Sequence, residues 1–246
     1  HIELYKLFFD HGVDTLITPV IGPEILATRD SYMQKIGADG LARIATHPDF
    51  LSFYEQYGVR ARFYGDYRKY LADTPYEHLS AIFDGLIETT KHNNRSRLFF
   101  GAFADNLGAT QAVAELAVNY FKERNAVPAR EKIVEMYYGE YVDKADIFIG
   151  FDRFAAFDYP LINWGAEDLY FTVSPSLYMT AKQLRAILYD HMYTRRAQER
   201  EYETFTRKEM DDIKRYYRSN VDNSLGIGEI YCGLWTPQFY RSGKQQ

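Results

Sequence analysis

Cysteine, positive charge and long apolar runs are all scarce in this 246-residue sequence. The single cysteine, Cys232, excludes an internal disulfide framework and a cysteine-only metal cluster, and it is typical of a protein in a reducing compartment. The formal net charge of −5 argues against a protein that binds nucleic acid through phosphate contacts. No apolar run reaches the roughly 18 residues that a membrane-spanning helix needs. We therefore expect a cytoplasmic protein with no membrane span and no nucleic-acid partner.

Motifs that identify several enzyme classes are also absent. The sequence has no G-x-x-x-x-G-K-S/T loop, no G-x-G-x-x-G, no G-x-S-x-G and no H-E-x-x-H. It also lacks the aspartate-rich D-D-x-x-D helices of all-helical terpene synthases, because the pair Asp211-Asp212 lies in a different setting. These absences argue against the corresponding nucleotide-binding, hydrolase, zinc-protease and all-helical terpene synthase classes.

Aromatic residues, by contrast, are abundant. The chain has 22 Tyr, 17 Phe and 2 Trp, which together make 17% of its residues. This is more ring surface than a small core needs. It predicts either a pocket lined with aromatic side chains or a large interface, where tyrosine is enriched.

Strand-like and helix-like segments alternate along the chain. Runs rich in β-branched and aromatic residues predict strands over 15–21, 59–66, 97–103, 145–151 and 169–173. Apolar residues at helical spacing predict helices over 2–10, 23–44, 50–57, 76–90, 111–124 and 128–138. Capping-box patterns at 180–183 and 206–209 predict two more helices, and no clear strand follows 169–173. The alternation predicts one α/β domain over residues 1–246, with a mainly parallel central sheet flanked by helices on both faces.

Polar side chains follow three of the predicted strands. They are Asp66 and Arg68, Asp105 and Asn106, and Asp152 and Arg153. The carboxyl ends of parallel strands meet at one edge of a sheet, where ligands of open α/β folds bind. Carboxylates can hold Mg²⁺ and arginine can bind phosphate, so this edge suits a largely apolar, phosphorylated substrate. The alternative is that Asp66 and Asp105 are turn residues and helix N-caps, positions that aspartate favours.

Three further features allow both a functional and a structural interpretation. Tyr32, just past the first strand, can donate a proton or stabilise a cation, but its position alone is more typical of a packing residue. His191 shares a helix face with Leu184 and Leu188, which is typical of a core histidine rather than a base. The pair Arg195-Arg196 is typical of a solvated helix face.

Longer stretches of the sequence resemble a known family. They are residues 137–151, 153–154 and 169–172, together with 51–54, 63–67 and 188–191. These segments are similar to bacterial diterpene synthases of the tuberculosinol and kolavelool type, which are built on the cis-prenyltransferase (undecaprenyl diphosphate synthase-like) fold. The resemblance extends over nearly the whole chain.

The motifs of the wider superfamily are present in altered form. Residues 62–66 look like its R-x-x-G-D, and 146–149 look like its D-L-L-I, but the following R-T-S-G-E has become Gly-Phe-Asp-Arg. The arginines that hold isopentenyl diphosphate are thus partly lost. Asp168 takes the place of the metal-binding Glu, and residues 226–228 are the nearest match to the C-terminal R-x-G. The family's Asp-Gly diphosphate motif would precede His1, so we expect its strand and helix to be missing from this sequence.

The resemblance implies a diterpene synthase with Mg²⁺ as its cofactor. A bicyclic C20 allylic diphosphate of the kolavenyl or tuberculosinyl type would lose pyrophosphate, aromatic rings would stabilise the cation by roughly 0.5–2 kcal/mol each, and water would quench it. The implied roles are catalysis for Tyr32 and Asp66 and metal binding for Asp168. The implied substrate-binding residues are Tyr64, Arg68, Asp105, Asn106, Phe151 and Arg153. The resemblance also implies a homodimer.

Three alternatives remain open. In the first, an acceptor such as adenosine replaces water, which makes the protein a diterpenyl transferase. In the second, the protein is a chain-elongating cis-prenyltransferase, although the lost arginines argue against this. In the third, it is a non-catalytic prenyltransferase subunit, against which Tyr32 and Asp66 argue.

Overall fold

The computed structural model describes residues 1–22, 31–104 and 106–237, without the side chains of 31–36 and 106. The chain divides into two compact units. Unit 1 comprises residues 1–146 and 156–167, and unit 2 comprises 147–155 and 168–246. Within the described ranges, no helix is long and apolar enough to cross a membrane. The single-domain assignment stays a prediction.

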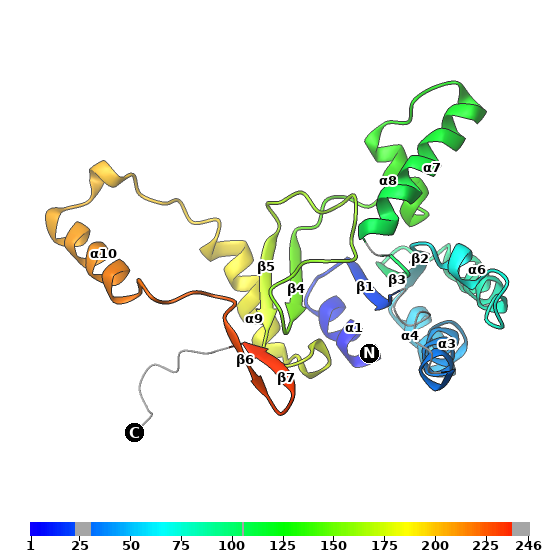
Figure 1. The fold of residues 1–246 in the computed structure, drawn as a ribbon, viewed down its shortest axis with the longest axis horizontal. Coiled ribbons are helices and arrows are strands. Elements are labelled where there is room, and N and C mark those ends of the chain that lie inside the picture. The colour runs from blue at the N-terminus through cyan, green and yellow to red at the C-terminus, as the bar shows by residue number, and fades with distance from the viewer. Residues whose placement is uncertain (23–30, 105, 238–246) are drawn as a thin grey trace. The chain divides into compact units, whose positions relative to one another are not determined.

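Unit 1 is built on a parallel three-stranded sheet (Figure 1). Its strands are β1 (Thr15–Ile21), β2 (Val59–Tyr64) and β3 (Ser96–Ala102). β3 lies in the middle, and both neighbours run parallel to it. The strands lie where the β-branched and aromatic runs predict them, because side chains of this shape pack well on a pleated surface.

One face of this sheet carries the core of unit 1. Val59, Ala61 and Phe63 alternate along β2 toward this face, and Leu98, Phe100 and Ala102 do the same along β3. The covering helices are α1 (Ile2–Asp10), α3 (Ser31–Thr46), α4 (Pro48–Gln56), α5 (Tyr67–Leu71) and α6 (His78–Thr90). The core is rich in rings, and the ring of Phe63 stacks on that of Phe83 with centroids 3.9 Å apart.

The opposite face of the sheet packs against α8 (Arg130–Tyr138), which follows α7 (Asn106–Arg124). The Tyr138 ring contacts both Tyr64 of β2 and Phe99 of β3. Helices thus flank the sheet on both faces, which confirms the predicted fold class.

The segment 156–167 belongs to unit 1, because several hydrogen bonds hold it there. The hydroxyl of Tyr64 donates to the carbonyl of Asp158, and that of Tyr138 donates to the carbonyl of Pro160. The Trp164 indole donates to the carbonyl of Ala145 at 2.8 Å. The first two bonds satisfy backbone carbonyls of this segment, and the third ties its Trp164 side chain to Ala145.

Unit 2 contains a parallel strand pair, an antiparallel hairpin and several helical segments (Figure 1). The strands are β4 (Ile147–Phe151), β5 (Asp168–Thr172), β6 (Gly228–Tyr231) and β7 (Leu234–Pro237). The helical segments are η1 (Ser176–Tyr178), α9 (Ala181–Tyr189), the π-helical η2 (Asp190–Thr194), η3 (Tyr202–Thr204) and α10 (Arg207–Ser219).

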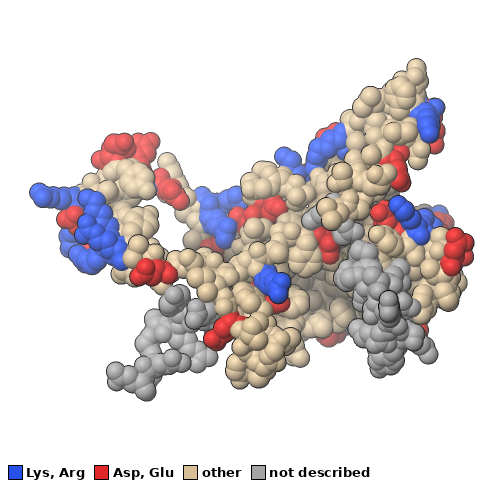
Figure 2. Space-filling view, viewed as in Figure 1, with Lys and Arg blue, Asp and Glu red and all other residues tan. Residues whose placement is uncertain are grey.

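Side-chain caps open the two long helices of unit 2, as the sequence predicts. The Thr206 hydroxyl accepts from the Glu209 amide while the Glu209 carboxylate accepts from the Thr206 amide, so both halves of the capping box are formed. At α9, the Thr180 hydroxyl accepts from the Gln183 amide. α10 carries many charged residues, and Figure 2 shows Lys and Arg gathered on it at the left of the view.

The structure corrects the prediction that no strand follows 169–173. The hairpin β6–β7 does so, with Cys232 and Gly233 between the paired residues Tyr231 and Leu234. Both turn residues have positive φ, at 50° and 83°, as a two-residue turn of the I′ type requires. Several helix boundaries also differ from the predicted ones, and α7, for example, begins at Asn106 and α8 at Arg130. Of the helix predicted over 23–44, residues 23–30 lie outside the described residues.

Candidate functional site

The backbone at the carboxyl ends of the three strands of unit 1 meets at one edge of the sheet. The Asp66 amide donates to the Phe103 carbonyl at 3.0 Å, and the Phe103 amide donates to the Ile21 carbonyl at 2.8 Å. These two bonds join the end of β1 to the segments that follow β2 and β3. The gathering of the polar side chains at this edge stays a prediction.

A glycine makes this close approach possible. Gly65 has φ of +97°, a backbone conformation that other residues rarely adopt. A Cβ atom at this position would lie 2.4 Å from the Ala102 carbonyl oxygen and 2.9 Å from the Ala104 Cβ. Only a residue without a side chain lets the turn before Asp66 lie against the end of β3.

Asp66 and Arg68 follow β2 at this edge. Asp66 occupies the N-cap position of α5, where its backbone carbonyl accepts from the Lys69 and Tyr70 amides, but its side chain makes no capping hydrogen bond. Arg68 forms a bidentate pair with Asp84 of α6 at 2.5 and 3.2 Å. The substrate-binding role of Arg68 and the catalytic role of Asp66 stay predictions.

Tyr64 is buried at the end of β2. It is 1% exposed, and its hydroxyl donates a hydrogen bond to the Asp158 carbonyl at 2.7 Å. Burial raises the pKa of this hydroxyl well above its ordinary value. In this arrangement Tyr64 is a neutral donor that holds the segment 156–167, and its contact with a substrate stays a prediction.

Three predicted site residues have no described side chain. Tyr32 lies in the first turn of α3 and Asn106 begins α7, while Asp105 lies outside the described residues. Asn106 lies four residues after the end of β3, whereas Tyr32 lies eleven residues after the end of β1. Their roles stay predictions.

In unit 2, the predicted site residues lie at opposite ends of the parallel strand pair. Ile147 of β4 pairs with Asp168, the first residue of β5, so Asp168 lies at the amino end. Phe151 and Arg153 come at and after the carboxyl end of β4, and both are exposed. Four residue steps of about 3.3 Å separate the two ends. Within unit 2, the structure does not bring Asp168 together with Phe151 and Arg153.

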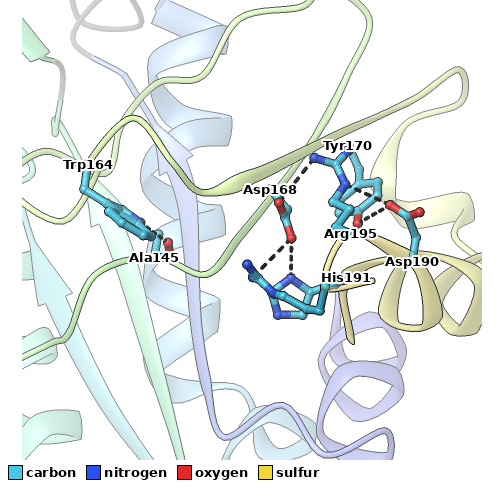
Figure 3. Close-up of polar contacts among 8 residues, drawn as sticks. Ala145, Trp164, Asp168, Tyr170, Asp190, His191 and Arg195 are labelled. Atoms are coloured by element: carbon cyan, nitrogen blue, oxygen red, sulfur yellow. Dashed lines mark hydrogen bonds and ion pairs between the residues drawn. The ribbon is translucent and has the colours of Figure 1, made fainter. Parts of the chain in front are cut away.

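Asp168 is the centre of a charged cluster (Figure 3). It is 7% exposed, and its Oδ2 lies 2.6 Å from His191 Nδ1. Because an ionised carboxylate only accepts, the Nδ1 atom carries the hydrogen. Arg195 Nη1 lies 3.2 Å from the other carboxylate oxygen, and Arg196 Nη2 lies 3.4 Å from Oδ2. The cations come from η2 and the residues just after it, a π-helical turn of the kind often found at functional sites.

A second carboxylate extends this cluster. Asp190 Oδ2 accepts from Arg195 Nε at 2.8 Å and from the Tyr170 hydroxyl at 2.7 Å. The hydrogen bond from Arg195, followed by that from Tyr170, lowers the pKa of Asp190. Burial and the bond to Asp190 raise the pKa of Tyr170 to about 12. The Arg195 guanidinium also lies 4.8 Å from the centre of the Tyr170 ring, so this arginine is fixed on three sides.

The surroundings of Asp168 do not fit a magnesium ion. Its oxygens already accept hydrogen bonds from one imidazole and two guanidinium groups. Two arginines beside the carboxylate would repel a divalent cation, and Mg²⁺ takes oxygen ligands. In the described part of the chain, no group of three or more His, Cys, Asp or Glu side chains is arranged to hold a metal. A magnesium requirement is therefore only an implication of the resemblance, and no reaction step below relies on it.

Sequence reasoning missed most of this cluster. The His191 ring is satisfied, as the sequence predicts, but its partner is the buried carboxylate of Asp168, which the sequence did not reveal. Arg195 and Arg196 are not merely a solvated face, since both pair with that same carboxylate. The available signal was the close spacing of Asp190, His191, Arg195 and Arg196 directly after an amphipathic helix. The partner Asp168 lies 23 residues before His191, which local patterns do not reveal.

Comparison with known proteins gives two related sequences, whereas no family model matches the chain. The chain is 39% identical over 236 residues to a tuberculosinyl adenosine transferase of Mycobacterium tuberculosis, covering 95% of this chain and 79% of that protein. It is 23% identical over 247 residues to a (+)-kolavelool synthase of Herpetosiphon aurantiacus, covering 96% of this chain and 78% of that protein.

Two solved structures show the same fold. A probable undecaprenyl diphosphate synthase from Campylobacter jejuni matches with a TM-score of 0.61 at 16% identity, over 81% of this chain and 89% of that one. A lavandulyl diphosphate synthase from Lavandula x intermedia matches with a TM-score of 0.56 at 12% identity, over 82% of this chain and 86% of that one. At these identities the similarity concerns the fold alone.

Proposed function

The chain belongs to the family of tuberculosinyl adenosine transferase, within the cis-prenyltransferase superfamily, and on that premise we propose that it transfers a C20 allylic group from its diphosphate to adenosine. The relatives and the fold indicate an enzyme of the prenyltransferase type. The observation that carries the choice of acceptor is the 39% identity to the transferase over 95% of this chain. The sequence alone favours water over adenosine as the acceptor, and this identity favours adenosine instead.

The reaction we propose breaks one bond and makes one. The carbon–oxygen bond between the allylic carbon and the diphosphate breaks, and its electron pair leaves with pyrophosphate. An adenosine nitrogen then supplies the electron pair for a new carbon–nitrogen bond. A ring nitrogen without a hydrogen keeps the resulting positive charge, whereas the amino nitrogen would pass its proton to a base or to solvent. We propose a bicyclic allylic group of the tuberculosinyl or kolavenyl type, because these are the groups in the relatives' names.

The edge of unit 1 supports a site for this reaction. The segments after its three parallel strands are joined by the Asp66 and Phe103 backbone bonds, and ligands of such folds bind beyond the carboxyl ends of strands. We propose that Asp66 and Tyr32 act on the reacting groups and that Arg68 and Asn106 contact the substrate. Substrate contact by Phe151, the last residue of β4, and by Arg153 just after it is a separate proposal for unit 2.

Water as the acceptor is the second candidate. The 23% identity to (+)-kolavelool synthase over 96% of this chain favours it. In that reaction a water oxygen forms the new bond to carbon, and its proton passes to a base or to solvent, giving a diterpene alcohol.

One assay separates the two acceptors. Purified protein is incubated with a bicyclic C20 allylic diphosphate, with and without adenosine, and products are identified by mass spectrometry. A diterpenyl adenosine formed only when adenosine is present supports the transferase. A diterpene alcohol formed at the same rate in both tubes supports the synthase instead, and no pyrophosphate release in either tube contradicts both.

Site variants test where the reaction takes place. We expect Asp66→Asn and Tyr32→Phe each to lower kcat by roughly a hundredfold, as loss of a proton-transfer group does. Asp73→Asn is the matched control, because Asp73 is an exposed turn residue just after α5. Full activity in a folded Asp66→Asn protein would remove Asp66 from the reaction.

We also propose that the protein is a homodimer, as the cis-prenyltransferase resemblance implies. Large hydrophobic side chains of unit 2 lie exposed to solvent. They include Tyr189, Tyr193, Tyr202, Tyr216, Tyr217, Ile230 and Tyr231. Exposed apolar surface of this extent is typical of an interaction surface. Sedimentation equilibrium should give twice the mass of one chain, and a single-chain mass at micromolar concentration would contradict the proposal.

A further inference from the structure

Three arginines of unit 1 surround a single carboxylate. Arg60 and Arg62 alternate along β2 and therefore lie on the same face of the sheet, and Arg97 of β3 lies opposite Arg60 in the strand register. Glu140 Oε2 is 3.0 Å from Arg60 Nε and 3.1 Å from Arg62 Nη2. Its Oε1 is 3.6 Å from Arg97 Nη1.

The arginine triad, defined as Arg60, Arg62 and Arg97, carries more positive charge than its surroundings balance. Arg62 is only 14% exposed and the other two are below 30%, yet the ion pairs of all three in the described structure go to Glu140. Mostly buried charges in proteins are normally paired. Three guanidinium groups against one carboxylate leave an excess of two positive charges.

The remaining contacts of the triad are to neutral oxygens. Arg97 donates to the Thr15 hydroxyl and the Tyr141 carbonyl, and Arg62 donates to the Ala61 carbonyl. The carboxyl end of α8, just before Glu140, adds a partial negative charge nearby. None of these groups supplies a full counter-charge.

The triad also has unused hydrogen-bond donors. Among the described residues, the Nε atoms of Arg60 and Arg62 are buried and have no hydrogen-bond partner. The Arg60 Nε atom lies near Glu140, but its hydrogen is not directed well enough at the carboxylate to form a hydrogen bond. Unpaired buried donors are uncommon in folded proteins, because each loses its bonds to water.

From this charge excess and these free donors, we propose that Arg60, Arg62 and Arg97 form a binding site for a dianionic phosphoryl group, with Glu140 as a competing internal anion. Guanidinium groups are the preferred partners of phosphate, which they bind with two parallel hydrogen bonds. A dianion would balance the two excess charges and give acceptors to the free Nε–H groups. Orthophosphate and pyrophosphate share this chemistry.

The proposed anion site is separate from the edge that carries Asp66. Arg60 and Arg97 are each the second residue of their strand and Arg62 is the fourth of the six residues of β2, whereas Asp66 follows the carboxyl end of β2. All three arginines of the anion site therefore lie within the strands, before the edge that carries Asp66. It does not depend on the proposed transfer reaction, and its test uses neither the allylic substrate nor adenosine.

The test is calorimetric titration of orthophosphate, and separately of pyrophosphate, into the full chain at pH 7.5 and constant ionic strength. We expect the wild-type protein to bind orthophosphate with a Kd of about 1 mM or tighter. Arg60→Gln should weaken this binding by roughly tenfold, as loss of one charged hydrogen-bond donor does. The control Arg215→Gln removes an exposed arginine of α10 that pairs only with Asp212 among described residues, and it should bind like wild type.

Glu140→Gln gives a result of the opposite sign. It removes the competing carboxylate while keeping the shape of the side chain, so it should tighten phosphate binding by several-fold. If the three arginines only hold Glu140 in place, none of these proteins should bind phosphate. Tighter binding of pyrophosphate than of orthophosphate to wild type, lost in Arg60→Gln, would identify pyrophosphate as the preferred source of the phosphoryl group.

Three outcomes overturn the proposal. The first is no heat of binding in the wild-type protein at phosphate concentrations up to 10 times the expected Kd. The second is equal phosphate affinity in wild type and Arg60→Gln. The third is weaker phosphate binding in folded Glu140→Gln than in wild type. If Glu140→Gln does not fold, the comparison of wild type with Arg60→Gln and Arg215→Gln still decides.

Discussion

Each unit of the chain holds one carboxylate that faces several cationic side chains, and the two clusters differ in charge balance. In unit 2, Asp168 contacts His191, Arg195 and Arg196, and Asp190 supplies a second carboxylate to Arg195. In unit 1, Glu140 alone faces three arginines. The cluster around Asp168 is close to neutral, while that around Glu140 has an excess of two positive charges.

This difference separates a structural role from a binding role. In the balanced cluster every cation has a carboxylate partner, and the Tyr170 ring also contacts Arg195, so the cluster can fix η2 without any ligand. In the unbalanced cluster, two arginine Nε–H groups have no acceptor among described residues. Counting charges and donors therefore distinguishes the two sites, although both look alike as groups of cations around one acid.

The two units also differ in where their aromatic residues lie. In unit 1, rings such as Tyr5, Phe53, Phe83 and Phe100 are buried in one core. In unit 2, rings such as Tyr216 are exposed, and Leu184 and Ile187 are the only described hydrophobic side chains there that are buried. The abundant aromatic residues of the sequence thus lie in two places. Many are buried in the core of unit 1, which holds more rings than we expected from the composition, and others are exposed on unit 2.

The largest expected effect breaks the core of unit 1. Phe83 is 0% exposed and stacks on Phe63, so Phe83→Ala should lower the free energy of unfolding by about 3–5 kcal/mol. Tyr216→Ala on α10, where the ring is 66% exposed, should change it by less than about 0.5 kcal/mol in the monomer. Urea denaturation at low protein concentration measures both, and equal effects would contradict the contrast between the units.

The next effect tests the balanced cluster. Asp168→Asn leaves two arginines beside a neutral amide, and removing one partner of a buried pair should cost unit 2 about 3 kcal/mol. Asp190→Asn is the control, and it should cost less because Asp190 is more exposed. Hydrogen exchange of β4 and β5 reports on this unit. If amide protection of β4 and β5 in Asp168→Asn is unchanged or higher than in wild type, Asp168 does not hold the cluster.

A smaller effect tests the close approach of the strands at the edge of unit 1. Gly65→Ala should cost about 2 kcal/mol or more, because its Cβ would meet the Ala102 carbonyl oxygen and φ is positive. Gly12→Ala has a similar φ but nothing within 4 Å, so it should cost only about 1 kcal/mol. Thermal unfolding compares the two variants. Equal losses would show that the turn before Asp66 does not lie against β3.

The smallest effect concerns acid sensitivity in unit 2. The hydrogen bond from Arg200, followed by those within the capping box, lowers the pKa of Glu209 to about 2. Because this pKa lies below its unfolded value of about 4.3, the stabilising contribution is present above that pH and is lost as pH falls toward 2. The helical circular dichroism signal to which α10 contributes should therefore decline as pH falls through this window. Glu209→Gln should remove the share of that decline that is due to the Glu209 carboxylate. The exposed Glu203→Gln should leave the decline as in wild type, and a decline in Glu209→Gln that matches wild type would contradict the assignment.

The sequence was sufficient for local structure but not for pairing between distant segments. The runs at 15–21 and 169–173 predict strands, and the pattern at 206–209 predicts its helix cap, because each depends on neighbouring residues. The β6–β7 hairpin escaped notice because Cys232-Gly233 is an uncommon turn pair and the flanking segments are only four residues long.

The candidate site divides in the same way. The segments of Asp66 and Phe103 could be expected to meet, since parallel strands end at one edge of a sheet. The His191–Asp168 bond and the Arg60–Glu140 pair could not, because each joins residues more than 20 positions apart whose contact depends on packing.

The most direct test of the proposed function is the fate of labelled adenosine. The full chain is incubated with a bicyclic C20 allylic diphosphate and adenosine labelled in its base, and the organic extract and released pyrophosphate are both quantified. Transfer to adenosine predicts labelled lipid product and pyrophosphate in equal amounts. Pyrophosphate release with no label in the extract would contradict transfer to adenosine.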